Sequence, residues 1–273
     1  MCKNPKKIDI KFNNKTVWII GASSGIGKAL AIDFAKLQAN LVLSSPELNE
    51  LEAVQTECLL FTEQCTVIPL DLEKNTDYRH LVNELIQKYA TIDYLLVVGG
   101  ISQRSLIHET PIDIDRKLME INYFGNIAIT KAVLPQMIKQ QSGHIITISS
   151  IVGKFGFPLR SAYSASKHAL HGFYETLRAE HKKDNINVTI VIPGRVRTNI
   201  SVNALNKEGK QHGKMDPGQD KGISAESCSK QIIKSIKKNK KETLIGGKEL
   251  FMVKIRKYVP FLFYKIVNKI DTK

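Results

Sequence analysis

Short apolar runs alternate with longer segments of helical periodicity along most of this chain, and no other feature restricts its fold as much. The first apolar run, Lys15–Ile20, leads through a glycine-rich turn into a helical pattern over Ala29–Leu37. The other predicted strands are Leu41–Ser44, Cys65–Leu70, Tyr94–Val98, His144–Ser149 and Asn187–Ile192, and the other predicted helices are Leu48–Glu57, Tyr78–Tyr89, Ile112–Lys139 and Tyr163–Lys182. Strands separated by helices pair in parallel, because each crossover is long and right-handed. We therefore expect a doubly wound parallel sheet in a three-layer α/β/α arrangement, with ligands at the carboxyl ends of the strands.

Length and charge distribution predict one domain with a distinct C-terminal end. The chain has 273 residues and no Pro-, Gly- or Ser-rich linker, which fits a single domain over residues 1–250 and an extension over residues 251–273. The formal net charge is +14, and residues 203–273 hold 17 Lys and Arg against 7 Asp and Glu, a local net charge of +10. Basic residues are not interleaved with aromatic ones on the main body, so we expect no nucleic-acid partner.

The glycine-rich turn Gly21–Gly27 has the position of a phosphate-binding turn. It reads Gly-Ala-Ser-Ser-Gly-Ile-Gly, follows the first predicted strand and opens the first predicted helix. Gly21 permits a tight turn, whereas Gly25 and Gly27 let the backbone approach a pyrophosphate at the positive end of the helix dipole. Taken alone, such a turn can also be an ordinary strand-to-helix loop.

Tyr163 and Lys167 are four residues apart in a predicted helix, so both side chains leave one face of it, one turn apart. An ammonium beside a phenol favours the phenolate, and we expect Lys167 to lower the pKa of Tyr163 from its ordinary value of about 10. Tyr163 would then serve as a general acid or base. Ser150, which ends a predicted strand, can hydrogen-bond a substrate oxygen at the same edge of the sheet. The alternative for the Tyr–Lys pair alone is two exposed residues on a helix.

These residues together resemble the short-chain dehydrogenase/reductase family in its Rossmann-like, single-domain form of about 250 residues. The resemblance covers residues 15–198 and rests on Gly21–Gly27, Asn122, Ser150, Tyr163, Lys167 and Pro193-Gly194. It implies an NAD(P)(H)-dependent oxidoreductase that interconverts a carbonyl and an alcohol, with Tyr163 as the general acid/base. It also implies that Ser150 positions the carbonyl oxygen, that Lys167 binds the nicotinamide ribose and that Asn122 holds a proton-relay water. Without the resemblance, Asn122 would be taken for a helix residue that points to solvent.

The resemblance further implies which residues bind the cofactor. Asp71 would hydrogen-bond the adenine, although a carboxylate after a strand is as readily a helix cap. Val196 and Thr198 would hold the nicotinamide amide. The complete set is Gly21, Ser23, Ser24, Gly25, Ile26, Gly27, Ser45, Asp71, Leu72, Gly99, Gly100, Tyr163, Lys167, Pro193, Gly194, Val196 and Thr198.

One motif departs from the family pattern, which usually has Asn-Asn-Ala-Gly at the end of the fourth strand. This chain has Val97-Val98-Gly99-Gly100 there, and apolar side chains replace the amides that brace the neighbouring strand. The departure motivates an alternative function, a catalytically weak NAD(P)-binding regulator or scaffold of the same fold.

Cofactor choice depends on the end of the second predicted strand. An NAD-binding member would place an Asp near Ser45, and an NADP-binding member would place an Arg near Pro46. Neither is present, and the missing carboxylate together with two small hydroxyls favours NADP(H), with NAD possible. Glu47 argues in the other direction, because its charge would repel a 2′-phosphate.

The last third of the chain predicts a lid and an amphipathic end. Residues 199–222 are polar and glycine-rich and follow the nicotinamide segment, where we expect a mobile lid over a lipophilic small molecule. Residues 251–267 carry apolar side chains at helical spacing with Lys between them, a pattern that suits contact with an anionic membrane surface. The alternative, which Pro260 favours by interrupting the stripe, is packing on its own domain or on a sister subunit. Relatives commonly form dimers or tetramers through the two long helices, here Ile112–Lys139 and Tyr163–Lys182.

The remaining signals concern metals and compartment. The four cysteines, Cys2, Cys58, Cys65 and Cys228, form no CxxC pair, so we expect buried free thiols and no metal site. Residues 1–12 lack an apolar signal-peptide core, and no apolar run approaches the ~18 residues of a membrane span. We therefore expect a cytoplasmic protein, with peripheral membrane association through the C-terminal residues as an option.

Overall fold

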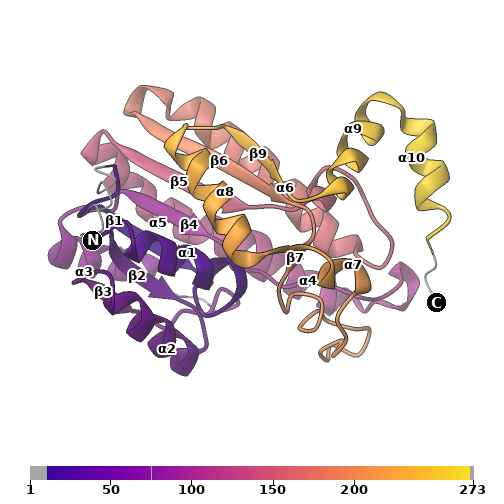
Figure 1. Cartoon of the computed structure of the whole chain (residues 1–273), viewed down its shortest axis with the longest axis horizontal. Helices are drawn as coiled ribbons and strands as arrows, with labels where there is room; N and C mark the ends of the chain where they lie inside the picture. The colour runs from indigo at the N-terminus through magenta and orange to yellow at the C-terminus, as the bar shows by residue number, and fades with distance from the viewer. Residues whose placement is uncertain (1–10, 75, 271–273) are drawn as a thin grey trace, which may run out of the picture.

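The computed structural model describes residues 11–74 and 76–270. Its centre is a seven-stranded sheet in the order β3-β2-β1-β4-β5-β6-β9, in which every neighbouring pair is parallel and helices cover both faces (Figure 1). These strands are β1 (Thr16–Ile20), β2 (Asn40–Ser44), β3 (Cys65–Val67), β4 (Tyr94–Val97), β5 (Gly143–Ile148), β6 (Ile186–Pro193) and β9 (Glu242–Ile245). The predicted doubly wound, three-layer, Rossmann-like fold is confirmed.

Helices connect the strands, and a second small sheet lies beyond β6. The helices are α1 (Gly25–Ala35), α2 (Leu48–Leu59), α3 (Tyr78–Tyr89), α4 (Ile112–Met119), α5 (Gly125–Gln140), α6 (Ser161–Glu180), α7 (Pro217–Asp220), α8 (Ala225–Lys237), α9 (Phe251–Tyr258) and α10 (Pro260–Val267). The small sheet pairs β7 (Val196–Arg197) with β8 (Ile223–Ser224) in parallel.

The residues of β1 divide the core into two layers, because successive side chains of a strand point to opposite faces. Val17 and Ile19 pack in the cluster that contains Phe34 of α1. Trp18 and Ile20 belong instead to the cluster that contains Tyr174 of α6. β1, which is apolar from Val17 to Ile20, is therefore buried on both sides, as expected for a parallel sheet.

Most predicted elements are shifted by a few residues at their ends, and two differ more clearly from the structure. The expected helix Ile112–Lys139 is interrupted by a π-helical turn at Glu120–Phe124, which separates α4 from α5. The strand expected over Cys65–Leu70 ends at Val67. Helix α8 and strand β9 were not predicted, although Cys228, Ile232 and Ile236 of α8 have helical spacing and are buried.

The C-terminal helices stand at the edge of the molecule beyond β9 (Figure 1). Pro260 begins α10, so the predicted interruption of the apolar stripe is confirmed. Phe263 is buried against Phe155, with ring centroids 5.0 Å apart, which attaches α10 to the loop after β5. Within the described residues, no helix combines the length and the apolar character that a membrane crossing requires.

Three of the four cysteines can be placed. Cys58, Cys65 and Cys228 are free and buried, as predicted. Cys2 lies outside the described residues, as do residues 271–273 of the C-terminal extension.

Candidate active site

The glycine turn after β1 packs directly on the chain that leaves β4. Gly21 has a φ of +84°, a conformation that favours glycine, and its amide donates to the carbonyl oxygen of Ser44 at 2.6 Å. A Cβ atom on Gly21 would lie 2.6 Å from the Cα of Gly99. The two glycines therefore permit a backbone contact that side chains would prevent, even though Val97 and Val98 replace the expected amides.

The start of α1 is equally close to the turn. A Cβ on Gly27 would lie 1.9 Å from the carbonyl oxygen of Gly21, and Gly25 has a φ of +53°. A side chain at either position would force the helix start away from the turn. Gly25, Ile26 and Gly27 of the first helical turn line a groove. A groove at the first amides of a helix is the arrangement that binds a pyrophosphate.

Two cavities lie along the carboxyl edge of the sheet, and they adjoin. A cavity of about 280 Å³ is lined by the turn and by the ends of β2, β3 and β4, including Ser23, Ser24, Ser45, Asp71, Leu72, Gly99 and Gly100. A larger cavity of about 920 Å³ is lined by Ser150, Tyr163, Lys167, Pro193, Gly194 and Val196, among others. Both cavities share Ile26, Gly100 and Thr198 in their walls. All the predicted cofactor-binding residues thus line one or both of two adjoining spaces, and the glycine cradle fits the pyrophosphate of a dinucleotide.

Ser150, Tyr163 and Lys167 meet in the wall of the larger cavity. Ser150 follows β5, and its Oγ accepts a hydrogen bond from the amide of Val152 at 3.4 Å. Tyr163 and Lys167 lie on α6, with the Lys167 ammonium 5.8 Å from the centroid of the Tyr163 ring. The predicted grouping of a phenol, an ammonium and a hydroxyl at the sheet edge is present.

The predicted effect of Lys167 on Tyr163 is wrong for this arrangement. Burial raises the pKa of Tyr163, while the Ser150 hydroxyl and the guanidiniums of Arg104 and Arg160 act in the lowering direction. The Lys167 ammonium instead donates to the carbonyl oxygen of Ile148 at 2.9 Å, and burial lowers its own pKa to about 8. Tyr163 is therefore a protonated phenol at neutral pH, suited to give its proton to an oxygen.

Asn122 is fully buried, contrary to its interpretation from the sequence alone as a solvent-facing helix residue. It lies in the π-helical turn, where its Oδ1 accepts from the amide of Ile101 at 2.8 Å. Its Nδ2 donates to the carbonyl oxygen of Ile101 at 2.9 Å and to the Ser166 hydroxyl at 3.1 Å. Asn122 thus ties the chain after β4 to α6, the helix that carries Tyr163 and Lys167. A π-helical turn interrupts regular helix geometry and frequently marks a functional site.

The adenosine side of the smaller cavity holds the residues that bear on cofactor choice. Glu47 lines this cavity, and its carboxylate accepts a hydrogen bond from the Ser23 hydroxyl at 3.0 Å. Asp71 lines it as well and accepts from the amide of Glu73 at 3.0 Å, in a local turn rather than as the cap of a helix. Lys28 is paired with Glu57 at 2.7 Å.

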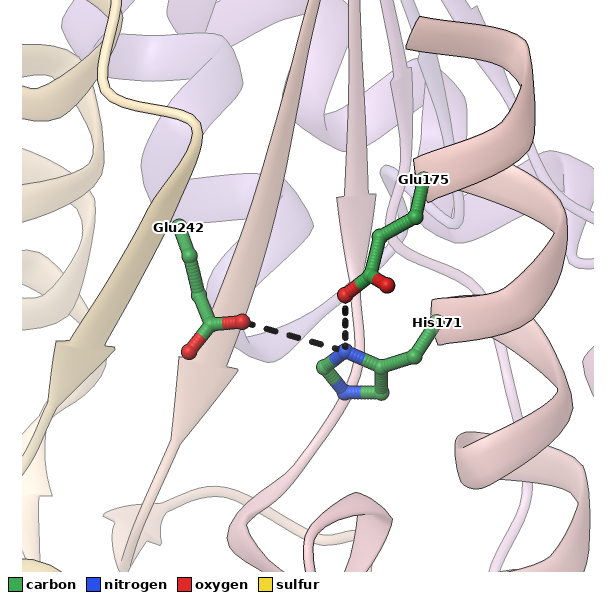
Figure 2. Close-up of side chains that lie close together, drawn as sticks. All are labelled: His171, Glu175 and Glu242. Carbon is green, nitrogen blue, oxygen red and sulfur yellow. Dashed lines mark ion pairs between the residues drawn. The ribbon is translucent and has the colours of Figure 1, made fainter. Parts of the chain in front are cut away.

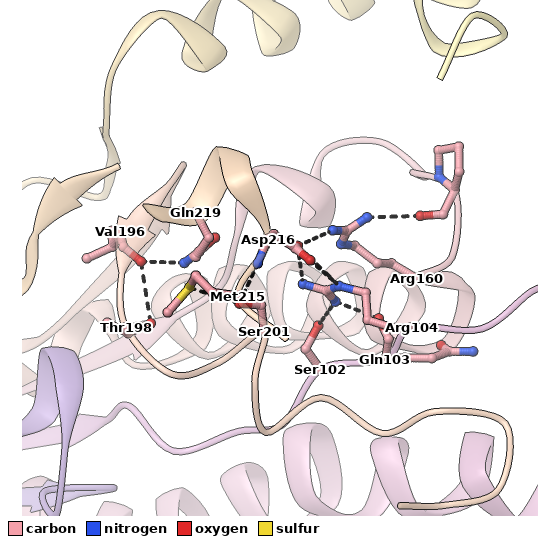
Figure 3. Close-up of polar contacts among 11 residues, drawn as sticks. Ser102, Gln103, Arg104, Arg160, Val196, Thr198, Ser201, Met215, Asp216 and Gln219 are labelled. Carbon is pink, nitrogen blue, oxygen red and sulfur yellow. Dashed lines mark hydrogen bonds and ion pairs between the residues drawn. The ribbon is translucent and has the colours of Figure 1, made fainter. Parts of the chain in front are cut away.

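A cluster of Arg104, Arg160 and Asp216 was not predicted. Figure 3 shows both guanidiniums directed at the single carboxylate of Asp216, each 2.7 Å from it at the nearest approach. Asp216 belongs to the segment expected as a lid, residues 199–222, so the ion pairs hold that segment against the cavity wall. The partners are more than 50 positions apart in the sequence, and no local pattern could have identified them.

A second polar cluster lies on the far side of Ser149, the residue before Ser150. His171 and Glu175 come from α6 and Glu242 from β9, with the His171 Nδ1 3.9 Å and 4.0 Å from the two carboxylates (Figure 2). Burial lowers the pKa of His171 to about 4, so its ring is neutral near pH 7. The Lys154 ammonium, 2.7 Å from Glu242, supplies a positive charge beside these carboxylates. His171 also contacts the Ser149 hydroxyl at 3.0 Å and so supports the end of β5.

Comparison with known proteins agrees with this geometry. The sequence model of the family described as short chain dehydrogenase matches residues 15–209. The relative called Dehydrogenase/reductase SDR family protein 7-like, from Drosophila melanogaster, is 39% identical over 268 residues, which cover 95% of this chain and 82% of that protein. Dehydrogenase/reductase SDR family member 7B from Mus musculus is 40% identical over 259 residues, which cover 93% of this chain and 80% of the mouse protein.

Solved structures agree with the fold. A short-chain dehydrogenase/reductase from Burkholderia phymatum, in complex with NAD, has a TM-score of 0.81 at 20% identity and covers 92% of this chain and 96% of its own. A metagenomic short-chain oxidoreductase in complex with NADP has a TM-score of 0.64 at 26% identity and covers 67% of this chain and 83% of its own. Because the matched residues 15–209 contain both the glycine turn and the helix with Tyr163 and Lys167, the chain belongs to the short-chain dehydrogenase/reductase family of oxidoreductases.

Proposed function

We propose that the protein is an NAD(P)(H)-dependent oxidoreductase that interconverts a carbonyl and an alcohol on a lipophilic small molecule. The observation that carries the proposal is the junction of the two cavities. A groove that begins at a phosphate-binding turn opens into the space lined by Ser150, Tyr163 and Lys167. A dinucleotide held in the groove would supply or accept the hydride at that junction.

The side chains have separate roles in this reaction. The Ser150 hydroxyl binds the carbonyl oxygen and orients it towards Tyr163. Tyr163 gives its phenolic proton to that oxygen during reduction and takes it back during oxidation. Lys167 would bind the nicotinamide ribose, and Asn122 holds the backbone beside Lys167 in place and would retain a proton-relay water.

For the cofactor we propose a preference for NADP(H), because Ser44, Ser45 and Pro46 at the end of β2 include no Asp that would pair with a ribose 2′-hydroxyl and repel a 2′-phosphate. The solved relatives in complex with NAD and with NADP support a nicotinamide dinucleotide of either kind. Glu47 opposes the preference, since its carboxylate lies in the same cavity and no arginine accompanies it there among the described residues. Titration of the protein with NADPH and with NADH by nucleotide fluorescence measures the preference directly.

The test of the activity is oxidation of NADPH or NADH by the purified protein with a panel of apolar ketones and aldehydes. Loss of absorbance at the reduced nicotinamide band that depends on protein and on carbonyl compound supports the proposal. Tight binding of the nucleotide without turnover of any carbonyl compound would favour the alternative, a regulator or scaffold that binds NAD(P).

As part of the same proposal, we propose that the C-terminal helices α9 and α10 make a peripheral contact with an anionic membrane. Phe251, Tyr258 and Phe261 are 64%, 69% and 75% exposed, and Lys254 and Lys257 of α9 lie between them in the sequence. Exposed aromatic side chains flanked by cations suit a lipid surface, and Met252 of α9 also lines the larger cavity. Co-sedimentation with phosphatidylserine vesicles should fall sharply when Phe251 and Phe261 are both changed to Ser. If the variant and the unchanged protein sediment equally, the proposed membrane contact is wrong.

We also propose the cytoplasm as the compartment, which subcellular fractionation tests.

For the assembly we propose a dimer or tetramer of this chain, paired through α4–α5 and α6. Ile112 and Phe124 are 61% and 49% exposed on the first of these segments, where a sister subunit would cover them. Light scattering of the protein and of Phe124→Glu distinguishes the states, and a monomer at micromolar concentration would refute the proposal.

A further inference from the structure

Arg104 and Arg160 lie side by side in the wall of the larger cavity, which also contains Ser150 and Tyr163. The Nη2 atoms of both arginines donate to the same oxygen of Asp216 at 2.7 Å (Figure 3). The remaining hydrogen-bond partners of the two arginines are uncharged: Arg104 also donates to the Ser102 hydroxyl and the Gln103 carbonyl, and Arg160 donates to the carbonyl of Pro158. Within the described part of the chain, neither guanidinium is paired with a second carboxylate.

The cluster therefore carries one unbalanced positive charge. The side chains of Arg104 and Arg160 are only 6% and 18% exposed, so water compensates little of it. Burial and the nearby Arg104 lower the pKa of Arg160 to about 10, the direction expected where positive charge is in excess. Leaving a charge unpaired in such surroundings is costly, and an anionic ligand would remove the cost.

The rest of the cavity suits an apolar body. Apolar side chains such as Phe155, Phe157 and Leu159 line it, and its volume of about 920 Å³ is large enough for a chain of a dozen carbons or a fused ring system. Besides Asp216, the acidic residues of the lining are Glu109, Glu208 and Glu249. Glu109 is paired with Lys207 at 3.3 Å, and Glu249 accepts the amides of Arg195 and Gly247. Among the described residues, none of these three carboxylates is paired with Arg104 or Arg160.

We propose that the substrate is an amphiphile with an anionic group, a carboxylate or a phosphate monoester, and that Arg104 and Arg160 bind this group while the carbonyl reaches Ser150 and Tyr163. Planar guanidiniums recognise both anions through paired, charge-assisted hydrogen bonds. Asp216 occupies part of the same donor set and competes with the ligand. The inference rests on the proposed function, because it assigns the substrate class of that site.

Binding to the full chain by isothermal titration calorimetry tests the inference without turnover. The probes are dodecanoate, dodecyl phosphate and the neutral 1-dodecanol, all kept below micelle-forming concentrations. We expect at least one anionic probe to bind about tenfold or more tightly than dodecanol, the usual effect of hydrogen bonds to a charged group. The comparison of the two anions shows whether carboxylate or phosphate is preferred.

Three substitutions separate recognition of the anion from a structural role of the cluster. Arg160→Gln should reduce the advantage of the anion to about threefold or less, while Asp216→Asn should increase it by removing the competitor. Arg116→Gln is the matched control, because it removes the same charge from an exposed helix residue that pairs with Asp113. Thermal unfolding of each variant verifies that it is folded, and Arg104→Gln replaces Arg160→Gln if that variant is not.

The outcomes distinguish this inference from the function on which it rests. Equal affinity for anionic and neutral probes, an advantage unchanged in Arg160→Gln or in the Arg104→Gln that replaces it, or no binding of any probe would overturn the anion site. If neutral ketones are reduced as efficiently as oxo acids of equal length, the enzyme remains and the substrate class is wrong. If the anion binds but no carbonyl compound is reduced, the proposed activity fails while the binding site stands.

Discussion

The contact between Gly27 and the glycine turn allows a direct prediction about the effect of a side chain at this position on the nucleotide groove. In Gly27→Ala the new Cβ would lie 1.9 Å from the carbonyl oxygen of Gly21, although such atoms do not approach closer than about 3 Å. The start of α1 and the turn must therefore separate by about 1 Å. Overpacking of this kind costs about 1–3 kcal/mol, and a backbone neighbour places the cost at the upper end. After a gain of about 1 kcal/mol in helix propensity, we expect a net loss of about 2 kcal/mol.

Gly172→Ala is the matched control. Gly172 lies within α6, and a Cβ there would meet nothing within 4 Å, so we expect a stabilisation of up to about 1 kcal/mol. Urea denaturation gives the free energy of unfolding of both variants, and fluorescence titration gives their affinity for NADPH. Gly27→Ala should also bind the nucleotide at least about tenfold more weakly, because its amides are displaced from the phosphates. The reasoning is refuted if the two variants are equally stable and bind NADPH equally well.

Three further predictions concern the pH dependence of stability, the pH dependence of the reaction and the choice of cofactor. Burial lowers the pKa of His144 to about 3, so between about pH 6.5 and pH 3 the unfolded chain binds a proton that the native chain does not. The free energy of unfolding should therefore fall by roughly 4 kcal/mol as the pH drops over that range. In denaturation curves taken at each pH, His144→Gln should flatten this fall, and an unchanged slope would contradict the prediction. Because burial raises the pKa of Tyr163, the rate of carbonyl reduction should be constant near neutral pH and fall only at alkaline pH, where the rate of alcohol oxidation should rise. If the pH–rate profiles have the same shape in both directions, Tyr163 is not the proton carrier. Glu47→Arg should raise the affinity for NADPH about tenfold relative to NADH by replacing a repelling charge with a pairing one, and an unchanged ratio would place the 2′-phosphate elsewhere.

The parts of this molecule that follow from local sequence were predictable. A strand that is apolar throughout and ends in glycines, such as Thr16–Ile20 before Gly21, carries its own signal because one short segment defines both the buried strand and the turn. The spacing of Tyr163 and Lys167 likewise fixes their common helix face. Ser150 could be added because parallel strands all end at the same edge of the sheet.

The parts that depend on distant contacts were not predictable. Asn122 looks like an exposed helix residue until the π-helical turn and the loop after β4 bury it against Ile101. The pKa of Tyr163 depends on burial and on two arginines outside its helix, and sequence spacing suggested only Lys167. The Arg104–Asp216 pair joins residues 112 positions apart, so only the folded chain shows that the cavity wall is positively charged.

The role of Tyr163 is tested most directly by single-turnover reduction of a ketone with the nucleotide already bound, in the protein and in Tyr163→Phe. The substitution removes the phenolic oxygen alone, so nucleotide affinity measured by fluorescence should change by less than about threefold. The rate of the reduction step should fall at least about 10²-fold, the usual contribution of a general acid. A Tyr163→Phe protein that binds the nucleotide normally and reduces the ketone at the full rate would contradict the account.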